Sequence, residues 1–475
     1  MMRIKFKFAA ILYIMVLAFS CSSYKQDGGD NIFAFTHVNV IPMNKEMVLK
    51  DYTVIIQNGV ITKLGSAKSL KVPEKATIIE SKGKYLIPGL SDMHVHLEGD
   101  AWNIMYKPES KFTKEQINFD DILFLYIANG ITTIDVMFAF PEHIELREKI
   151  NNNEILGPQL VLSKMIDGAG KAWPPPLGTW VNNAKEAKSA VIEAHKLGFD
   201  RIKVYSFLDK ESYDSIITTA KGLNIPVDGH IPLSTSVEHV IASGQNMITH
   251  SEEIMKFAKD YTPEQIEYFA SFVANSHTWL TATLTTSNNL ISLFEYSEQE
   301  FSKTGTQYLH PMGTDIWNYI YNNLYKNVPQ ENRNAIHDGY KHFQIPFTYE
   351  FYKKGGKLLI GTDALIPSNV PGFSLHEELE QLVNIGLSPF EALKVSTTNT
   401  HEFLGELEIA GTIESGKKAN LVLLDENPLE RISNTKRIIG VMTHNQWISK
   451  KEIDQRLVEI SISYSQLKKD RLNQK

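Results

Sequence analysis

The sequence predicts an α/β fold: a barrel of alternating strands and helices, with β-rich segments near both chain ends. Three observations support this prediction. In the middle of the chain, a helical segment that stops at a glycine is followed repeatedly by a short apolar strand. The strands of this kind number eight, which closes a barrel. Runs of β-branched residues separated by turn residues occur before and after this region.

The chain begins with a segment typical of bacterial export. Residues 1–20 contain three basic side chains, then an apolar run, then small residues before Cys21, the only cysteine. This pattern predicts a secretory signal, and the polar residues 21–30 after it predict a tether. The alternative is an uncleaved anchor helix, but the apolar run is shorter than the ~20 residues that a bilayer requires.

The composition is that of an ordinary globular protein, with 43% hydrophobic and 22% charged residues. Removal of residues 1–20 changes the formal net charge from −7 to −10. A mildly acidic mature chain argues against nucleic acid as a partner. The sequence leaves the oligomeric state open, a homo-oligomer included.

Residues 31–88 start as a β unit. The runs TVIIQ and VITKLG are joined by Asn58-Gly59, and an Asn-Gly pair between β-branched runs predicts a tight hairpin. Similar material, KKANLVLLD and RIIGVMTHNQWIS, lies within residues 406–450. We expect these two segments to form one composite β domain.

Residues 89–405 follow the barrel pattern. Helical segments that end at Gly198, Gly222 and Gly244 each precede a short strand, as does FTYEFYKKGG before KLLIGTD. The eight predicted strands lie within residues 89–96, 131–137, 158–166, 199–205, 223–230, 245–250, 279–285 and 357–363.

Polar side chains stand at the predicted strand ends, where barrels of this kind build their active sites. Residues i and i+2 of a strand point to the same side, so the two histidines of DMHVH can converge on one object. Two interpretations are open: the histidines bind one metal ion, or they form only a hydrogen-bonded pair at the end of a strand. Six residues share this placement: His94, His96, Lys203, His230, His250 and Asp363.

Neutral imidazoles and carboxylates bind divalent cations such as zinc, and catalytic sites leave a position open for water. The four histidines and Asp363 suffice for one such ion and nearly suffice for two. A lysine ammonium would repel the cation, so Lys203 fits only as a carbamate formed with carbon dioxide, which is anionic and bridges two metals. Otherwise Lys203 binds a substrate carboxylate.

The ordered motifs PGLSDMHVHL, DRIKVY, IPVDGH, ITHSEE and LIGTDA resemble the amidohydrolase superfamily, from about Phe33 to Trp447. Within it, the chain looks closest to the branch related to imidazolonepropionase and to metal-dependent prolidases. The resemblance implies a distorted (β/α)8 TIM barrel that carries a small β-sandwich made from both chain ends.

The resemblance also implies residue roles. His94 and His96 bind the more buried metal, Lys203 is a carboxylated bridging ligand, and His230 and His250 bind the second metal. Asp363 binds metal and acts as acid/base for a metal-activated hydroxide, while His250 or His230 helps to stabilise the oxyanion. The stretch DGAGKAWPPPLGTW departs from the family pattern, so substrate contacts there do not carry over.

Three further residues are candidates for substrate contact. Tyr205 points to the same side of its strand as Lys203, Trp173 belongs to a stiff proline-rich loop, and His376 begins the helix after the eighth strand. For His376 we favour a role in supporting the ligands or in starting the helix over direct ligation. Tyr205 and Trp173 have packing roles as their alternatives.

An aromatic-rich insertion, residues 285–356, predicts extra helices over the barrel mouth, because connections between a strand and a helix usually take only ~2–6 residues. Two interpretations of the insertion remain: it forms a lid that recognises the substrate, or it forms extra structural helices or a dimer contact. Residues 451–475 predict a charged terminal helix.

The leading functional hypothesis is a metal-dependent hydrolase of amide bonds in small molecules such as dipeptides or N-acyl amino acids. A lactonase or esterase on the same site is the first alternative, and a non-catalytic ligand-binding surface lipoprotein is the second. Lipid on Cys21 would anchor the protein in the periplasm or at the cell surface, attached to the bacterial envelope.

Overall fold

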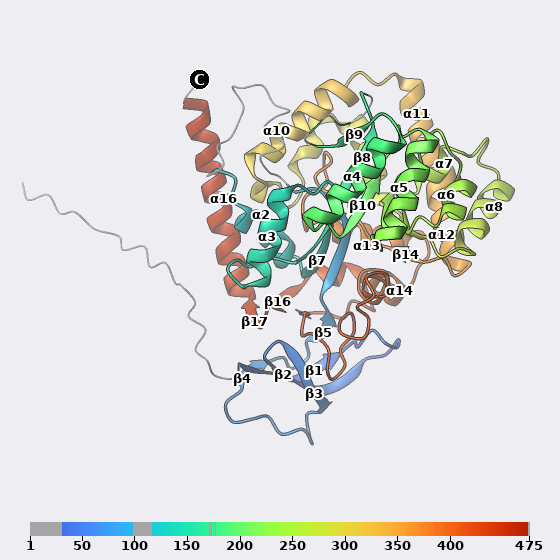
Figure 1. Cartoon of the computed structure of the whole chain (residues 1–475). Helices are drawn as coiled ribbons and strands as arrows, with labels where there is room; N and C mark the ends of the chain where they lie inside the picture. The colour runs from blue at the N-terminus through green and yellow to red at the C-terminus, as the bar shows by residue number, and fades with distance from the viewer. Residues whose placement is uncertain (1–30, 98–115, 171–172, 174, 176, 474–475) are drawn as a thin grey trace, which may run out of the picture. The chain divides into compact units, whose positions relative to one another are not determined.

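Eight parallel strands form a barrel (Figure 1). Its seam closes where the first strand meets the segment after the last: Val95 bridges Ala364, and the Met93 N–H donates to the Ile360 carbonyl at 2.9 Å. The predicted distorted (β/α)8 barrel is confirmed. In order around the barrel, the strands are β6 (Leu90–Val95), β7 (Ile131–Val136), β8 (Gln159–Gly168), β10 (Arg201–Val204), β11 (Val227–Gly229), β12 (Met247–Thr249), β13 (Trp279–Thr281) and β14 (Leu358–Leu359).

This computed structural model describes residues 31–97, 116–170, 173, 175 and 177–473. The predicted signal segment, Cys21 and the tether lie outside the described residues. The chain from residue 31 onward is one compact unit. Among the described helices, none combines the length and the apolar character needed to cross a membrane.

The helices between the barrel strands end largely as the sequence predicts. Gly198 and Gly244 adopt left-handed backbone angles, φ 92° and 77°, directly after α4 and α6. The predicted stop at Gly222 is wrong: α5 continues to Leu223, and Asn224 takes the left-handed position with φ 55°. Asparagine tolerates this conformation, so it can end a helix where glycine is expected. The helices are α2 (Phe119–Ala128), α3 (Pro141–Asn151), α4 (Ala184–Leu197), α5 (Lys210–Leu223), α6 (Val237–Ser243), α7 (Glu252–Met255) and α8 (Pro263–Ala274).

Strands from both parts of the chain form a second, mixed sheet that is continuous in the order β17-β16-β15-β5-β1-β2-β3, with β4 paired to β1. Asn58 and Gly59 make the predicted two-residue turn with φ 52° and 78°. A hydrophobic cluster separate from that of the barrel, including Phe35, Ile56 and Leu423, lies against the sheet. The strands are β1 (Ile32–Val40), β2 (Leu49–Gln57), β3 (Val60–Ser66), β4 (Thr77–Glu80), β5 (Tyr85–Pro88), β15 (Leu421–Leu424), β16 (Ile438–Thr443) and β17 (Gln446–Ser449); β9 (Thr179–Val181) extends the barrel sheet beside β8.

The insertion forms helices, as predicted, and it touches the barrel mouth. Trp317 of α10 is fully buried and donates from Nε1 to the Leu365 carbonyl, just beyond β14, at 3.0 Å. Five-residue π-helical segments follow α10 and α11. The helices of this region are α9 (Leu284–Tyr296), α10 (Pro311–Ile320), α11 (Gln330–Gly339) and α12 (Ile345–Lys353).

Helices close the C-terminal part of the chain. The last of them, α16, runs along the barrel, where Arg456 pairs with Asp121 of α2 and Arg471 pairs with Asp315 of α10 at 2.8 Å (Figure 1). The predicted terminal helix is therefore present and packed, not free. The helices are α13 (Ser374–Asn384), α14 (Pro389–Val395), α15 (Thr398–Phe403) and α16 (Lys450–Asn473).

Candidate metal centre

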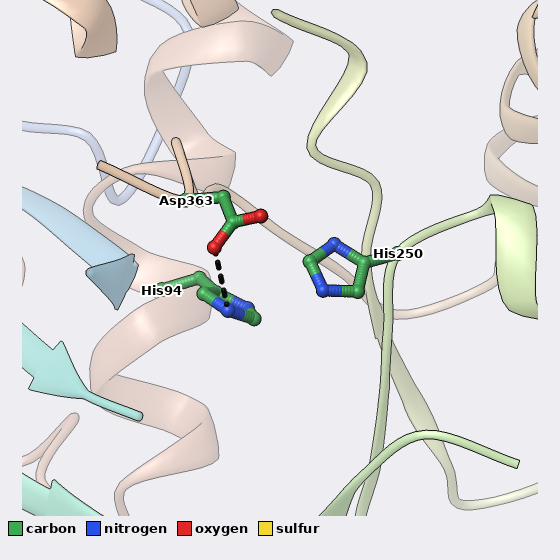
Figure 2. A group of neighbouring side chains, drawn as sticks. All are labelled: His94, His250 and Asp363. Carbon is green, nitrogen blue, oxygen red and sulfur yellow. Dashed lines mark ion pairs between the residues drawn. The ribbon is translucent and has the colours of Figure 1, made fainter. Parts of the chain in front are cut away.

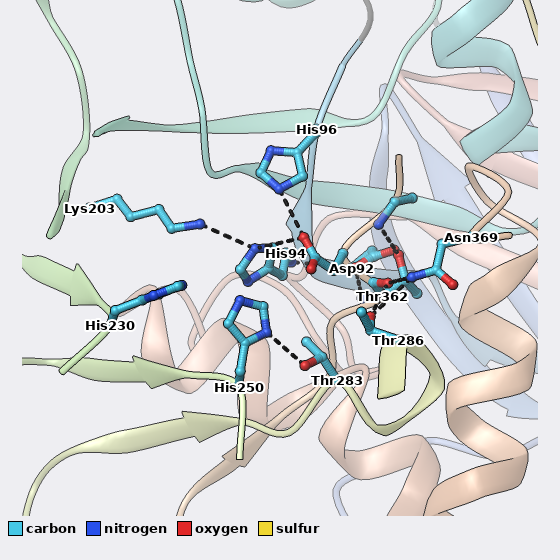
Figure 3. A network of polar contacts seen from close by, with 12 residues as sticks. Asp92, His94, His96, Lys203, His230, His250, Thr283, Thr286, Thr362 and Asn369 are labelled. Atoms are coloured by element: carbon cyan, nitrogen blue, oxygen red, sulfur yellow. Dashed lines mark hydrogen bonds and ion pairs between the residues drawn. The ribbon is translucent and has the colours of Figure 1, made fainter. Parts of the chain in front are cut away.

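The structure brings the six predicted ligands to one place at the mouth of the barrel (Figures 2 and 3). Each comes from the carboxyl end of a strand or from the residues directly after it, on β6, β10, β11, β12 and β14. All six are at least nine-tenths buried: His94, His96, Lys203, His230, His250 and Asp363.

The distances among these atoms fit a shared cation. His94 Nε2 and His96 Nε2 lie 3.2 and 2.9 Å from the same oxygen, Asp363 Oδ1. Ligands about 2.0–2.1 Å from a tetrahedral ion stand roughly 3.3 Å from one another. Ligand atoms of His94, His250 and Asp363 all lie within 4.8 Å of one another. The donor set and its spacing therefore fit a divalent metal.

The protonation states also suit metal binding. Burial lowers the pKa of His94 to about 3, and burial with the neighbouring His94 lowers the pKa of His250 well below its ordinary value. Burial raises the pKa of Asp363, but His94 and His96 outweigh it and hold the pKa well below its usual range. Neutral imidazoles and an ionised carboxylate are the forms that bind a cation.

Lys203 lies inside the cluster, with Nζ 3.3 Å from His94 Nε2. Its side chain is buried, and burial lowers the pKa of the amine to about 8. Roughly a tenth of the amine is therefore neutral at pH 7, far more than for an exposed lysine. Only the neutral amine is a nucleophile, so the environment suits reaction with an electrophile such as carbon dioxide.

Two ligands are oriented by neighbours that sequence reasoning missed. His230 Nδ1 contacts both Ser206 Oγ, at 2.8 Å, and Glu253 Oε1, at 3.0 Å. His250 Nδ1 lies 2.8 Å from Thr283 Oγ1 (Figure 3). With Nδ1 engaged, Nε2 of each ring is free to bind a cation. The sequence pattern that could have identified Glu253 is its position three residues after His250 in ITHSEE.

We expect Glu253→Gln to weaken metal binding by about 10–100-fold, the usual effect of losing a carboxylate behind a histidine ligand. Glu253 is fully buried and also accepts from the Ile231 N–H at 3.2 Å, which glutamine can still satisfy. Competition with a chelator measures the affinity. Glu252→Gln, one residue away, is the matched control, because among the described residues Glu252 pairs with Lys256 and with no metal ligand. Equal loss in both variants would contradict the assignment.

Asp92, a further residue that sequence reasoning missed, joins the two sides of the barrel seam beside the site. Its carboxylate accepts from the Thr362 N–H at 3.0 Å and from Thr362 Oγ1 at 2.7 Å. Burial raises the pKa of Asp92 to about 7, although these hydrogen bonds act to lower it. Asp92 stands two residues before His94, on the same side of the strand, and this spacing was the available signal.

Three site residues hold left-handed backbone angles that L-residues rarely adopt. His250, Thr283 and Asp363 have φ values of 69°, 50° and 53°. Each such conformation costs on the order of 1–3 kcal/mol. Their concentration at three neighbouring strand ends indicates that the surrounding structure holds these side chains in place for the site.

A small cavity of about 50 Å³ opens beside the ligands. Tyr205 and Trp173, both predicted candidates, line it; the Trp173 Nε1–H donates to Tyr205 Oη at 3.3 Å, and the Tyr205 ring stacks on His230 at 3.9 Å between centroids. Ile320 of the insertion forms another wall, with Phe138, Leu365 and Ile366. The insertion thus contributes directly to the site.

His376 does not reach this cavity. Its Nδ1 lies 2.9 Å from Thr435 Oγ1, and it lines a different hollow beneath α16. The structure therefore gives it no place in contact with a substrate at the metal cluster, in keeping with its position in the first turn of α13. A larger hollow of about 790 Å³ lies away from the ligands, beside Asn58 and Lys418.

Barrel and site together define an enzyme class: (β/α)8 proteins whose catalytic groups converge at the carboxyl ends of the strands. The family profile described as Amidohydrolase family matches residues 85–448. The chain belongs to the amidohydrolase family, and is a hydrolase of that family.

Solved structures share the fold. A Xaa-Pro dipeptidase with methionine bound in its active site has a TM-score of 0.68 and 19% identity, over 88% of this chain and 100% of that one. A putative prolidase from Bifidobacterium longum has a TM-score of 0.67 and 20% identity, over 90% and 99%. A bottromycin amidohydrolase has a TM-score of 0.68 and 18% identity, over 90% of both chains. These identities establish the fold alone.

Curated relatives match over short stretches. Enamidase of Eubacterium barkeri is 31% identical over 90 residues, 19% of this chain and 20% of that protein. Imidazolonepropionase of Bacillus cereus is 44% identical over 55 residues, 12% of this chain and 13% of that protein. The matched stretches span a fifth or less of these relatives.

Proposed function

We propose that this protein hydrolyses amide bonds of small substrates, such as dipeptides or N-acyl amino acids, with one or two zinc ions held by the six-residue cluster. The observation that carries the proposal is the convergence of His94, His96 and His250 on Asp363 at the barrel mouth. The fold shared with prolidases supports small peptide-like substrates.

A divalent cation bound here supplies two effects, a lowered pKa of water and polarisation of the substrate carbonyl. The chain's own residues do the rest. Asp363, ionised and at the cavity wall, accepts the proton of the attacking water and returns it to the leaving nitrogen. Thr283 fixes the His250 ring, and Phe138 and Ile320 help to exclude bulk water.

Lys203 in this proposal carries carbon dioxide as a carbamate. The neutral amine forms an N–C bond, one C=O electron pair moves to oxygen, and nitrogen releases a proton. The product is an anion among histidines, where an ammonium would repel a cation. The buried position and lowered pKa of Lys203 support this step.

The lowered pKa makes carbamate formation pH-dependent. Because the pKa is about 8, the neutral fraction grows as pH rises and is roughly a tenth at pH 7. We expect the initial rate of labelling of metal-free protein at a constant concentration of dissolved ¹³CO2, followed by NMR, to rise about tenfold per pH unit below 8 and to level above it. Lys203→Ala is the control and should show no signal; a signal that persists in it would place the carbamate elsewhere.

A substrate panel tests the function itself. The soluble protein, with zinc and bicarbonate, is assayed against dipeptides, N-acyl amino acids, lactones and aryl esters. Amine release that a chelator abolishes supports the proposal. Turnover of esters or lactones alone would favour the alternative chemistry, and tight ligand binding without turnover would favour a binding protein.

We also propose that the protein is exported and anchored to the bacterial envelope through lipid on Cys21. The signal-like residues 1–20 directly before this cysteine support the proposal. Cys21→Ala should move the protein from the membrane fraction to the soluble fraction of cells fractionated at high salt, which also releases proteins held on membranes by charge alone. Full membrane retention of the variant would contradict lipid attachment at this residue.

A further inference from the structure

Charge is divided unevenly along this chain. Residues 31–88, which contain β1 to β5 and are called the basic lobe here, hold eight lysines and four acidic residues. The remaining residues, 89–475, hold 36 basic and 49 acidic residues. The acidic remainder of the protein does not repel this basic segment. An external anionic surface would attract it.

The lysines of the basic lobe are available to such a surface. Lys84 pairs with Asp425, whereas the other seven are exposed and, within the described residues, make no ion pair. Five stand on loops, Lys50 stands near the start of β2, and Lys63 stands on the edge strand β3; the loop lysines are Lys45, Lys68, Lys71, Lys75 and Lys82. Internal structure therefore does not account for their charge.

Apolar side chains are exposed among these lysines. Met47 stands between Lys45 and Lys50 and is 38% exposed, and Ile78 stands between Lys75 and Lys82 and is 60% exposed. Ile79, beside it, is buried, so Ile78 faces outward from β4. Lysines with exposed apolar residues between them are typical of surfaces that contact lipid headgroups and the outermost acyl chain.

Strands β1 to β4 of the basic lobe lie on one side of the barrel, beside the connection from β5 to β6 (Figure 1). The chain passes from β5 through Gly89 directly into the amino end of β6, whereas the ligands lie at the carboxyl ends of the strands. A membrane against the lobe would therefore leave the mouth open to the aqueous phase.

We propose that the basic lobe binds an anionic phospholipid surface. The interaction is independent of the lipid proposed on Cys21, because it uses only residues of the described fold. Nucleic acid would also attract lysines, but the exposed Met47 and Ile78 favour lipid. Protection of the edge strand β3 against pairing explains Lys63 alone, not the loop lysines.

The test uses the compact unit from Asn31 to Lys475, which lacks the tether, in co-sedimentation with vesicles. Vesicles of phosphatidylcholine are compared with vesicles that also contain phosphatidylglycerol, at low and at physiological salt. The variant is Lys68→Glu with Lys71→Glu and Lys75→Glu. The matched control changes three exposed, unpaired lysines of α4, Lys185, Lys188 and Lys196, to glutamate.

We expect binding only to the anionic vesicles, weakened by salt. Each lysine lost should weaken binding about fivefold, and the glutamates add repulsion, so the triple variant should lose at least about 100-fold. The α4 variant should bind nearly as the unaltered protein does. Ile78→Ser should weaken binding more than Leu197→Ser, an equally simple change at an exposed site of α4. Equal loss in both triple variants, no binding to anionic vesicles, or preference for random-sequence RNA over vesicles would each overturn the proposal.

Discussion

Asp363→Asn is expected to lower turnover by about 10²–10⁴-fold, the range that a positioned acid/base contributes. Asparagine keeps the size of the side chain and an oxygen that faces His94 and His96, but it cannot accept the proton of water. We therefore expect most of the bound metal and the melting temperature to be retained. Steady-state kinetics with metal analysis of the same sample measures both.

Asp167→Asn is the matched control for this variant. Asp167 is also a buried carboxylate at a strand end, on β8, but it accepts from the Phe207 N–H at 2.8 Å and lies outside the ligand cluster. It should change turnover little. Near-normal activity of Asp363→Asn with metal bound would remove Asp363 from the proposed acid/base role.

Arg201→Met is expected to destabilise the fold by about 3–5 kcal/mol, because it leaves a buried carboxylate without its partner. Arg201 Nη2 lies 2.8 Å from Asp228 Oδ1, a second contact joins Nε to Oδ2, and both residues are nearly inaccessible. Asp135, also buried, lies near this pair, and burial raises its pKa to about 8. Urea unfolding followed by circular dichroism measures the loss.

Two comparisons make this prediction specific. The double variant Arg201→Met with Asp228→Leu removes both charges and should recover most of the lost stability. Arg147→Met removes the more exposed pair with Asp200, which should cost about 1 kcal/mol or less. A double variant no more stable than Arg201→Met would show that packing, not the unpaired charge, sets the loss.

The barrel could be predicted from sequence because its elements are marked locally. Several of the buried strands are short and apolar, and a left-handed glycine that ends a helix precedes β10 and β12, at Gly198 and Gly244. The predicted helix end at Gly222 was wrong because several residues near a helix end can take the left-handed conformation. The local sequence does not decide which of them does so. Asn224 does so here.

The convergence of the six candidate ligands could likewise be predicted, since a strand end fixes where a side chain points. The residues that orient these ligands could not be predicted from the sequence. Glu253 and Thr283 reach His230 and His250 through turns whose geometry depends on packing between neighbouring strands. His376, which stands near the eighth strand in sequence, lines the hollow beneath α16 and not the cavity beside the ligands.

The seam of the barrel links the beginning and the end of this architecture. The contact between Asp92 and Thr362 joins residues 270 positions apart, and Asp363 follows directly. A growing polypeptide therefore cannot assemble the cluster until the last barrel strand has been synthesised and has docked against the first. The time needed to synthesise these residues therefore sets the earliest moment at which the site can be complete. A shortened chain that ends before Thr362 lacks Asp363 and has no complete site.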